Sequence, residues 1–367
     1  MRQDVPIRHM LAMRCAAERI PVTGGFELTP RCNLNCKMCY IHMSPQESAE
    51  RGREHTAQEW IDLGKQAVEA GTLFLLLSGG EPFLRPDFRE IYLGLTKLGL
   101  SVSINSNGTL IDDEAVEWLK QSPPAQINIS LYGASRETYA ALCGDPMGYD
   151  RAVHAIDALQ KAGILVSINA TMTPINDRDM ESIAAFGKER GLQVKSTYYL
   201  FPPERREPGS PRPLRRYDPE TMGRLSAKAQ WLTEDQQRLR AFAQQQADGE
   251  NFEKLDDCVF SKDAAMGCLA GSSQFWVTWD GRMTPCGMMN QPCAQPFQKG
   301  FREAWKQIAE ETSKLRLPPQ CKACALRSAC LSCAAINYCE TGRTDTRPDF
   351  LCRLTASYCR TLKELCK

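Results

Sequence analysis

The sequence has almost no excess charge of either sign, few histidines and no long hydrophobic run. Its 367 residues include 45 Lys and Arg against 44 Asp and Glu, so a net charge of +1 gives no reason to expect nucleic acid. The longest strongly apolar stretch, residues 73–77, is far shorter than the roughly 20 residues of a membrane-spanning helix. No apolar signal-peptide segment follows the N-terminal charges. We therefore expect a cytoplasmic protein that binds neither nucleic acid nor a membrane.

Cysteine, in contrast, is abundant and unevenly placed. Residues 258–367 hold 12 of the 17 cysteines, and residues 1–257 hold 5. Disulfide scaffolds are usually small and secreted, whereas this chain is long enough to bury a core and shows no export signal. In a reducing compartment, closely spaced cysteines more often bind zinc or iron–sulfur clusters. Isolated cysteines such as Cys15 and Cys143 are more typical of buried core thiols.

Between residues 24 and 200, short apolar runs alternate with amphipathic stretches. Glycine follows four of the helical stretches, as it commonly does at helix C-termini. Six such alternations predict an α/β fold with a parallel sheet or barrel, in which ligands bind at the carboxyl ends of the strands. The expected strands are 25–29, 73–78, 101–105, 126–131, 165–171 and 193–199, and the expected helices lie near 57–70, 87–98, 112–121, 136–142, 149–162 and 178–190.

Residues 201–257 differ in character from the rest. A Pro- and Arg-rich stretch runs to about residue 219, and a Gln-rich stretch that predicts one helix follows to about residue 247. We interpret this region as a bridge between domains, and it is either a substrate-facing helix or a solvated linker. Candidate substrate contacts are Glu204, Arg205, Arg206 and Tyr217.

Three cysteines, Cys32, Cys36 and Cys39, directly follow the first expected strand. Three thiolates on a four-iron cluster leave one iron open to a non-protein ligand. A structural zinc site needs a fourth protein ligand, which His42 could supply. The next strand ends in Gly79-Gly80-Glu81-Pro82, and glycines at a strand end allow close approach to the backbone.

Together these two motifs resemble those of the radical S-adenosylmethionine enzyme superfamily, over residues 24 to about 200. The resemblance implies a partial (β/α)6 TIM-like barrel in which Cys32, Cys36 and Cys39 hold a catalytic [4Fe–4S] cluster beside S-adenosylmethionine. The family takes a hydrogen atom from its substrate with the 5′-deoxyadenosyl radical. Two departures are Tyr132, where relatives often have Asp, and the absence of a carboxylate-binding Arg near Cys143. The implied cofactor-binding residues are Met38, Gly79, Gly80, Glu81, Ser130 and Leu200.

The C-terminal cysteine spacing resembles the SPASM extension of this family, which carries two auxiliary [4Fe–4S] clusters. The resemblance implies, by position, that the ligands of the first cluster are Cys258, Cys268, Cys286 and Cys333. It implies that those of the second are Cys321, Cys324, Cys330 and Cys352. The gap before Cys333 departs from the usual pattern, so Cys339 is an alternative ligand. A pair of zinc-ribbon sites is the other interpretation of the tail. The expected organisation is an N-terminal extension (1–23), a barrel (24–200), a bridging region (201–257) and a cysteine-rich SPASM domain (258–367).

The resemblance also implies a function, because SPASM-bearing enzymes mostly modify ribosomally made peptides. We expect oxidative cross-linking of a peptide, through a thioether or a carbon–carbon bond, with electrons from a donor such as flavodoxin or ferredoxin. About 23 residues precede the first strand, fewer than the leader-binding domain that many peptide maturases carry. Either a separate protein would deliver the peptide, or this enzyme would recognise it through the barrel and residues 201–257. Peptide epimerisation is one alternative. Formylglycine formation is disfavoured because Gly287 follows Cys286 where that class usually has Asp, and a zinc-binding interaction protein is the non-enzymatic alternative.

Overall fold

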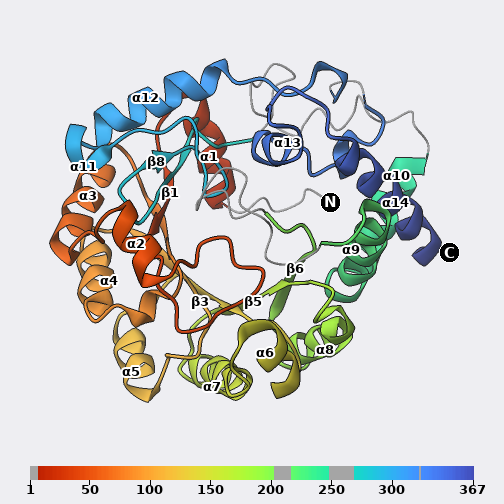
Figure 1. The fold of residues 1–367 in the computed structure, drawn as a ribbon, viewed down its shortest axis with the longest axis horizontal. Coiled ribbons are helices and arrows are strands. Elements are labelled where there is room, and N and C mark those ends of the chain that lie inside the picture. The colour runs from red at the N-terminus through yellow and green to blue at the C-terminus, as the bar shows by residue number, and fades with distance from the viewer. Residues whose placement is uncertain (1–6, 202–215, 248–267, 322–323) are drawn as a thin grey trace.

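The computed structural model describes residues 7–201, 216–247, 268–321 and 324–367. A curved sheet lies at its centre, and helices surround this sheet (Figure 1). Six strands pair in parallel in chain order, which confirms the predicted α/β partial barrel. These strands are β1 (Thr23–Glu27), β2 (Phe74–Ser78), β3 (Ser101–Ser106), β4 (Gln126–Ser130), β5 (Val166–Thr171) and β6 (Gln193–Thr197).

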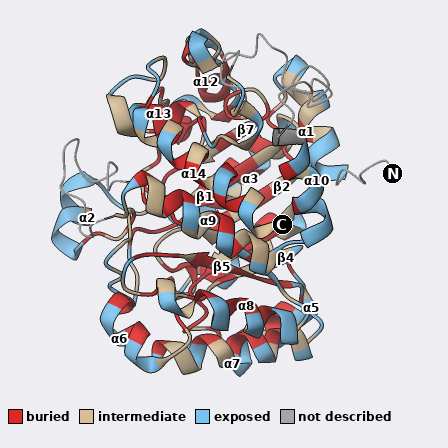
Figure 2. Cartoon of the chain, turned by 90° about the vertical axis from the view of Figure 1, so that its right-hand side faces the viewer, coloured by how far each residue is buried: buried red, intermediate tan, exposed pale blue. Residues whose placement is uncertain are grey.

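Helices on the outside of the sheet connect these strands, as the alternating pattern predicted. Strand and helix ends differ from the predicted ones by at most two residues. The helices are α3 (Ala57–Glu69), α4 (Phe88–Lys97), α5 (Asp113–Gln121), α6 (Arg136–Cys143), α7 (Gly148–Lys161) and α8 (Met180–Glu189). Their apolar sides and the outer face of the strands form the buried core, and exposed residues lie on the outer surface (Figure 2).

Two strands that the sequence did not predict extend the sheet beyond β1. Strand β7 (Gln274–Val277) pairs in parallel with β1, and β8 (Met283–Thr284) pairs antiparallel with β7. Gly24 and Gly25 of β1 make this possible, since a Cβ on either would lie 2.1 Å from the ring of Phe275 or Trp276. The cysteine-rich region therefore completes one side of the barrel.

Further helices surround this addition. Unpredicted α1 (Ile7–Glu18) and α2 (Pro45–Arg51) flank β1, and α11 (Pro296–Lys299) and α12 (Phe301–Lys314) follow β8. The Gln-rich stretch forms two helices, α9 (Pro219–Thr233) and α10 (Gln236–Ala247), in place of the single predicted helix. The break occurs where Asp235 accepts a hydrogen bond from the backbone N–H of Arg238, a helix-capping contact. Helix α9 packs along α14 (Asp349–Leu365), and α13 (Ala334–Thr341) precedes α14.

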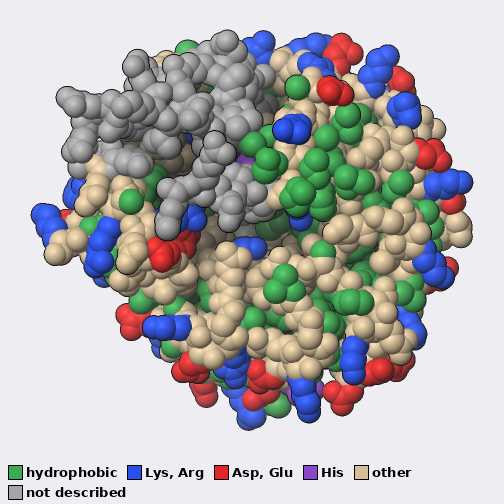
Figure 3. Space-filling view, turned by 180° about the vertical axis from the view of Figure 1, so that it is seen from behind, with side chains coloured by type: hydrophobic (Ala, Val, Ile, Leu, Met, Phe, Trp, Pro, Cys, Tyr) green, Lys and Arg blue, Asp and Glu red, His purple; other side chains and the backbone are tan. Residues whose placement is uncertain are grey.

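The surface carries charges of both signs. Lys and Arg alternate with Asp and Glu around the rim of the face seen from behind (Figure 3). Among the described residues, none of the helices combines the length and apolar character that crossing a membrane requires.

Candidate active site

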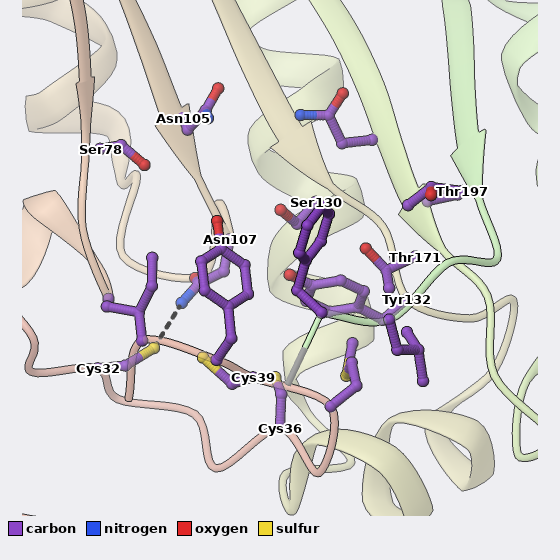
Figure 4. Close-up of a pocket in the computed structure, with 18 of the residues that line it drawn as sticks. Cys32, Cys36, Cys39, Ser78, Asn105, Asn107, Ser130, Tyr132, Thr171 and Thr197 are labelled. Atoms are coloured by element: carbon purple, nitrogen blue, oxygen red, sulfur yellow. Dashed lines mark hydrogen bonds between the residues drawn. The ribbon is translucent and has the colours of Figure 1, made fainter. Parts of the chain in front are cut away.

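Cys32, Cys36 and Cys39 lie on one loop at the carboxyl end of β1, and they face a common pocket (Figure 4). Backbone N–H groups point at two of the sulfurs: that of Leu34 lies 3.4 Å from Cys32 Sγ, and that of His42 lies 3.2 Å from Cys39 Sγ. These backbone contacts therefore orient the sulfurs of Cys32 and Cys39.

The chemistry of this donor set fits a bound cationic group. Burial raises the pKa of the Cys32 thiol to about 12, and a hydrogen bond with Cys143 together with burial raises the pKa of the Cys36 thiol. These thiols ionise readily only when a metal centre offsets the buried negative charge. Within the described ranges, no three His, Cys, Asp or Glu side chains are grouped as they would be around a single metal ion. A four-iron cluster holds its thiolates farther apart than one ion does.

The Gly79-Gly80 pair lies directly on the cysteine loop. The backbone N–H of Gly80 donates to Thr29 O at 2.7 Å, and that of Glu81 donates to Arg31 O at 2.9 Å. A Cβ on Gly79 would lie 2.6 Å from Thr29 O, and one on Gly80 would lie 2.2 Å from Arg31 O. Larger side chains would therefore separate the end of β2 from the cysteine loop.

Glu81 is fully buried and does not line the pocket. Its carboxylate accepts hydrogen bonds from the Phe83 N–H (3.1 Å), the Ser106 hydroxyl (2.9 Å) and the Asn107 N–H (2.7 Å). Burial raises its pKa to about 7, although these hydrogen bonds favour the ionised form. Glu81 thus joins the ends of β2 and β3 next to the cysteines.

Asn107 connects Glu81 to the cysteine loop. Its side-chain amide donates to Cys32 Sγ at 3.6 Å and to Asn33 Oδ1 at 2.9 Å. Its own oxygen accepts hydrogen bonds from the N–H and hydroxyl of Thr109. The sequence analysis missed this residue, although its Ser-Asn-Gly-Thr context at a strand end is a recognisable turn signal.

A partly buried ionic network holds the start of the same loop. Glu54 accepts hydrogen bonds from Thr29 Oγ1 (2.5 Å) and from both Nε and Nη2 of Arg31 (2.8 Å each). Although burial alone raises the pKa of Glu54, hydrogen bonds from Arg31 and Thr29 bring it below its ordinary value. Arg85, which is 5% exposed, donates to the carbonyls of Leu28 and His55 and to Asp87.

The pocket itself is a cavity of about 400 Å³ that extends from the cysteines into the barrel. Of the expected cofactor-binding residues, Met38, Gly79, Gly80, Ser130 and Leu200 line it. The Ser130 hydroxyl hydrogen-bonds the Tyr132 side chain, and burial raises the pKa of Tyr132 well above its ordinary value. Lining residues that the sequence analysis missed include Asn105, Asn107, Asn169, Thr171, Lys195, Thr197 and Met288.

The cysteine-rich region contributes Met288 to this pocket, two residues after Cys286. Cys268, Cys286 and Cys333 pack in one small apolar cluster. Burial raises the pKa of Cys268, and the nearby Cys333 raises it further. Cys258, the fourth residue expected in this group, lies outside the described residues. Cys333 accepts the N-cap hydrogen bond of α13, whereas Cys339 lies nearer the other end of that helix.

The second expected group of cysteines is also close together. Burial raises the pKa of Cys352, and the neighbouring Cys330, Cys321 and Cys324 raise it further. Burial also raises the pKa of Cys321, and the nearby Cys330 and Cys324 raise it further. Helix α14 therefore brings Cys352 to a loop that is some 20 to 30 residues distant in sequence.

Comparison with known proteins agrees with this arrangement. The sequence model of the Radical SAM superfamily matches residues 26–187. The chain is 30% identical over 345 residues to an AdoMet-dependent heme synthase of Methanosarcina barkeri, covering 91% of this chain and 95% of the relative. It is 31% identical over 182 residues to a PqqA peptide cyclase of Rhizobium meliloti, covering 49% and 48% of the two chains.

A solved structure gives the same overall fold. Streptococcus suis SuiB, bound to S-adenosylmethionine, superposes with a TM-score of 0.67 at 19% sequence identity. The match covers 91% of this chain and 77% of SuiB. The shared fold therefore extends through the barrel and into the cysteine-rich region.

Proposed function

Because the chain belongs to the Radical SAM superfamily, we propose that Cys32, Cys36 and Cys39 hold its [4Fe–4S] cluster and that the adjoining cavity holds S-adenosylmethionine. The observation that carries this proposal is the placement of three half-buried thiols at one end of a cavity lined by Met38, Ser130 and Leu200. When bound, these groups supply hydrogen-atom abstraction from an unactivated carbon.

The chain's own residues hold and shield the reacting groups. Asn107 and Glu81 fix the ends of β3 and β2 against the cysteine loop. Tyr132 and Met288 line the pocket from distant regions of the chain, and with a substrate bound they would help to exclude water from it. A radical reaction needs such a closed and ordered site, since water and stray hydrogen donors would compete with the substrate.

We also propose that residues 258–367 are a SPASM domain with two auxiliary [4Fe–4S] clusters. The first would use Cys258, Cys268, Cys286 and Cys333, and the second would use Cys321, Cys324, Cys330 and Cys352. Their grouping in the structure supports this assignment for the seven cysteines that are described. Four thiolates per cluster leave no open iron, which suits electron transfer. For the rest of the chain we propose an N-terminal extension (1–23), a barrel (24–200) and a bridging region (201–257). We also propose that a flavodoxin or ferredoxin supplies electrons to the clusters.

For the substrate, we propose a peptide that undergoes an oxidative cross-link. Amide and hydroxyl side chains line the cavity, and a second cavity of about 480 Å³ shares Lys195 and Thr197 of β6 with it. Two cavities that meet along one strand suit an extended chain better than a compact ligand. The likeness to a PqqA peptide cyclase over the barrel half of the chain supports the same class.

A tetrapyrrole is the second candidate substrate. The likeness to an AdoMet-dependent heme synthase favours it because that likeness extends through both the barrel and the cysteine-rich region. An iron porphyrin would have to fit its ring plane between the aromatic residues Tyr132, Tyr199 and Phe201 that line the cavity.

The cofactor assignment is tested by anaerobic reconstitution and an assay for 5′-deoxyadenosine with dithionite as reductant. The wild-type protein is expected to form it, and the triple variant Cys32→Ala, Cys36→Ala, Cys39→Ala is expected not to. Cys15→Ala, on α1, is the matched control. Cleavage of S-adenosylmethionine by the triple variant would show that the active site is elsewhere.

The substrate class is tested by offering both candidates to the reconstituted enzyme. Candidate precursor peptides are expected to lose about two mass units on cross-linking, whereas epimerisation in deuterated water leaves only a deuterium gain. Turnover of Fe-coproporphyrin III with no peptide modified would replace the peptide assignment by the tetrapyrrole one.

A further inference from the structure

The lumen of the barrel contains two rows of polar side chains beneath the cysteine loop. Strand register places Asn105, Asn128 and Ser167 side by side on β3, β4 and β5. The next row toward the cysteines contains Ser130 and Asn169, followed by Lys195 on β6. Side chains of paired residues in a sheet point to the same face, so each row faces the lumen together.

The lower row satisfies its own hydrogen bonds. Ser167 Oγ donates to Asn128 Oδ1 at 2.7 Å, and Asn128 Nδ2 donates to Asn105 Oδ1 at 2.8 Å. These bonds fix the amide orientations, because each oxygen already serves as an acceptor. The lower row therefore forms a rigid polar floor, from which Asn105 still reaches the cavity.

The upper row has unused donors. In the part of the chain that the structure describes, neither the Asn169 amide nor the Lys195 ammonium has a hydrogen-bond or ion-pair partner. The two residues are directly paired across β5 and β6, and both line the cavity that holds the three cysteines. Among the described lining residues, Lys195 is the one side chain that is cationic, and none is a carboxylate.

Lys195 also lies where the barrel opens. Strand β6 pairs with β5 on one side and ends the described sheet on the other. The second cavity lies beyond this edge, between β6, α9, α10 and α14, and Lys195 lines both cavities. A ligand entering the lumen from that side would pass the ammonium group before it reached the cysteines.

We propose that Lys195 and Asn169 bind a carboxylate of the substrate and so position it in the lumen opposite Cys32, Cys36 and Cys39. An ammonium donor beside a neutral amide donor matches the two oxygens of a carboxylate. The proposal rests on the proposed function, since it names the group by which that substrate is held. A peptide Glu or Asp side chain and a carboxylate side chain of a tetrapyrrole are the two sources of this group.

The test measures binding without turnover, so it does not depend on hydrogen abstraction. Reconstituted full-length protein is dialysed, with no reductant, against two pools of capped hexapeptides that carry Glu or Gln at the fourth position and are otherwise random. Mass spectrometry then compares retention of the pools. Wild-type protein is expected to prefer the Glu pool by roughly tenfold, as for a hydrogen bond to a charged group. Lys195→Met is expected to lose that preference, and Lys195→Arg to keep most of it.

Two further variants and one further probe sharpen the result. Asn169→Asp places a carboxylate beside Lys195 and is expected to reverse the preference, and Lys188→Met, on the exposed side of α8, serves as the control. Fe-coproporphyrin III is compared with its tetramethyl ester. If wild-type protein prefers neither peptide pool but prefers the free acid of the porphyrin, and Lys195→Met loses that preference, the result assigns the bound carboxylate to a tetrapyrrole.

Two outcomes would overturn the proposal. One is equal preference for the acidic ligands in wild-type and Lys195→Met proteins. The other is a loss of S-adenosylmethionine binding in Lys195→Met, which would assign the ammonium group to the carboxylate of the cofactor. Failure of the proposed function has a separate signature, namely that wild-type protein forms no 5′-deoxyadenosine while its selectivity for acidic ligands persists.

Discussion

The side-chain amide of Asn107 lies 3.6 Å from the sulfur of Cys32, while its backbone N–H donates to Glu81 at 2.7 Å. One residue at the end of β3 therefore links the end of β2 to the cysteine loop. These contacts hold Cys32, a proposed cluster ligand, in a fixed position relative to the ends of β2 and β3.

Replacing Asn107 by Ala should lower the reduction potential of the proposed catalytic cluster. A hydrogen bond to a ligand sulfur stabilises the more negative reduced state, and its loss makes reduction harder. A redox titration followed by electron paramagnetic resonance measures the midpoint potential. Asn105→Ala is the control, because Asn105 lines the same cavity but its side-chain oxygen accepts a hydrogen bond from Asn128. An equal shift in both variants would contradict the argument.

The Glu81 carboxyl should make stability fall as the pH rises toward neutrality. Its pKa is raised from 4.5 to about 7, so between these values the folded protein holds a proton that the unfolded chain releases. Stability is then lost with increasing pH through that window, by up to about 3 kcal/mol. Thermal unfolding of cluster-free protein from pH 5 to 8 should show a steeper decline for wild type than for Glu81→Gln. Parallel curves would show that Glu81 does not titrate there.

Much of this site could be predicted from sequence, because its chemistry depends on residue types at short spacings. Cys32, Cys36, Cys39 and the glycine pair fall in two loops directly after apolar strands. Asn169 and Lys195 were missed because they lie within strands, where polar residues at every second position indicate a lumen only after the barrel is recognised. Those alternating polar positions were the available signal.

The fold, like the site, has parts that local sequence predicts and parts that depend on distant contacts. The six parallel strands follow from local periodicity, whereas β7 depends on its partner. Its four residues form a strand because Phe275 and Trp276 pack on the bare backbone of Gly24 and Gly25. Neither segment's sequence alone predicts that contact, because it joins positions about 250 residues apart.

Arg85→Met should destabilise the protein by about 3 kcal/mol and loosen the cysteine loop. The guanidinium is buried and donates hydrogen bonds to the carbonyls of Leu28 and His55 and to the Asp87 carboxylate. All three acceptors would lose this donor in the variant. Urea unfolding measures the change. Arg53→Met, which removes an exposed ion pair with Glu59, should cost much less stability, and comparable losses in the two variants would count against the network.

Glu340→Gln should weaken the attachment of the cysteine-rich region to the barrel. Glu340 accepts hydrogen bonds from Tyr199 (2.5 Å) and from both terminal nitrogens of Arg216, and Arg216 also stacks on Phe350. Loss of the charge leaves a half-buried guanidinium unpaired, at a cost of about 2–3 kcal/mol. In a double-mutant cycle with Arg216→Met, non-additive losses support the pair, and strictly additive ones would show that the two residues act independently.

Cys333 and Cys339 should differ sharply as ligands of the first proposed auxiliary cluster. Cys333 packs with Cys268 and Cys286 in one apolar cluster, whereas Cys339 lies on α13 nearly two helical turns further along. Reconstituted wild-type protein should hold about 12 irons, Cys339→Ala about 12, and Cys333→Ala about 8. Loss of four irons in Cys339→Ala with full loading of Cys333→Ala would exchange the two assignments. Two or three zinc ions with no iron in wild type would instead show that these cysteines form zinc sites and that the SPASM assignment is wrong.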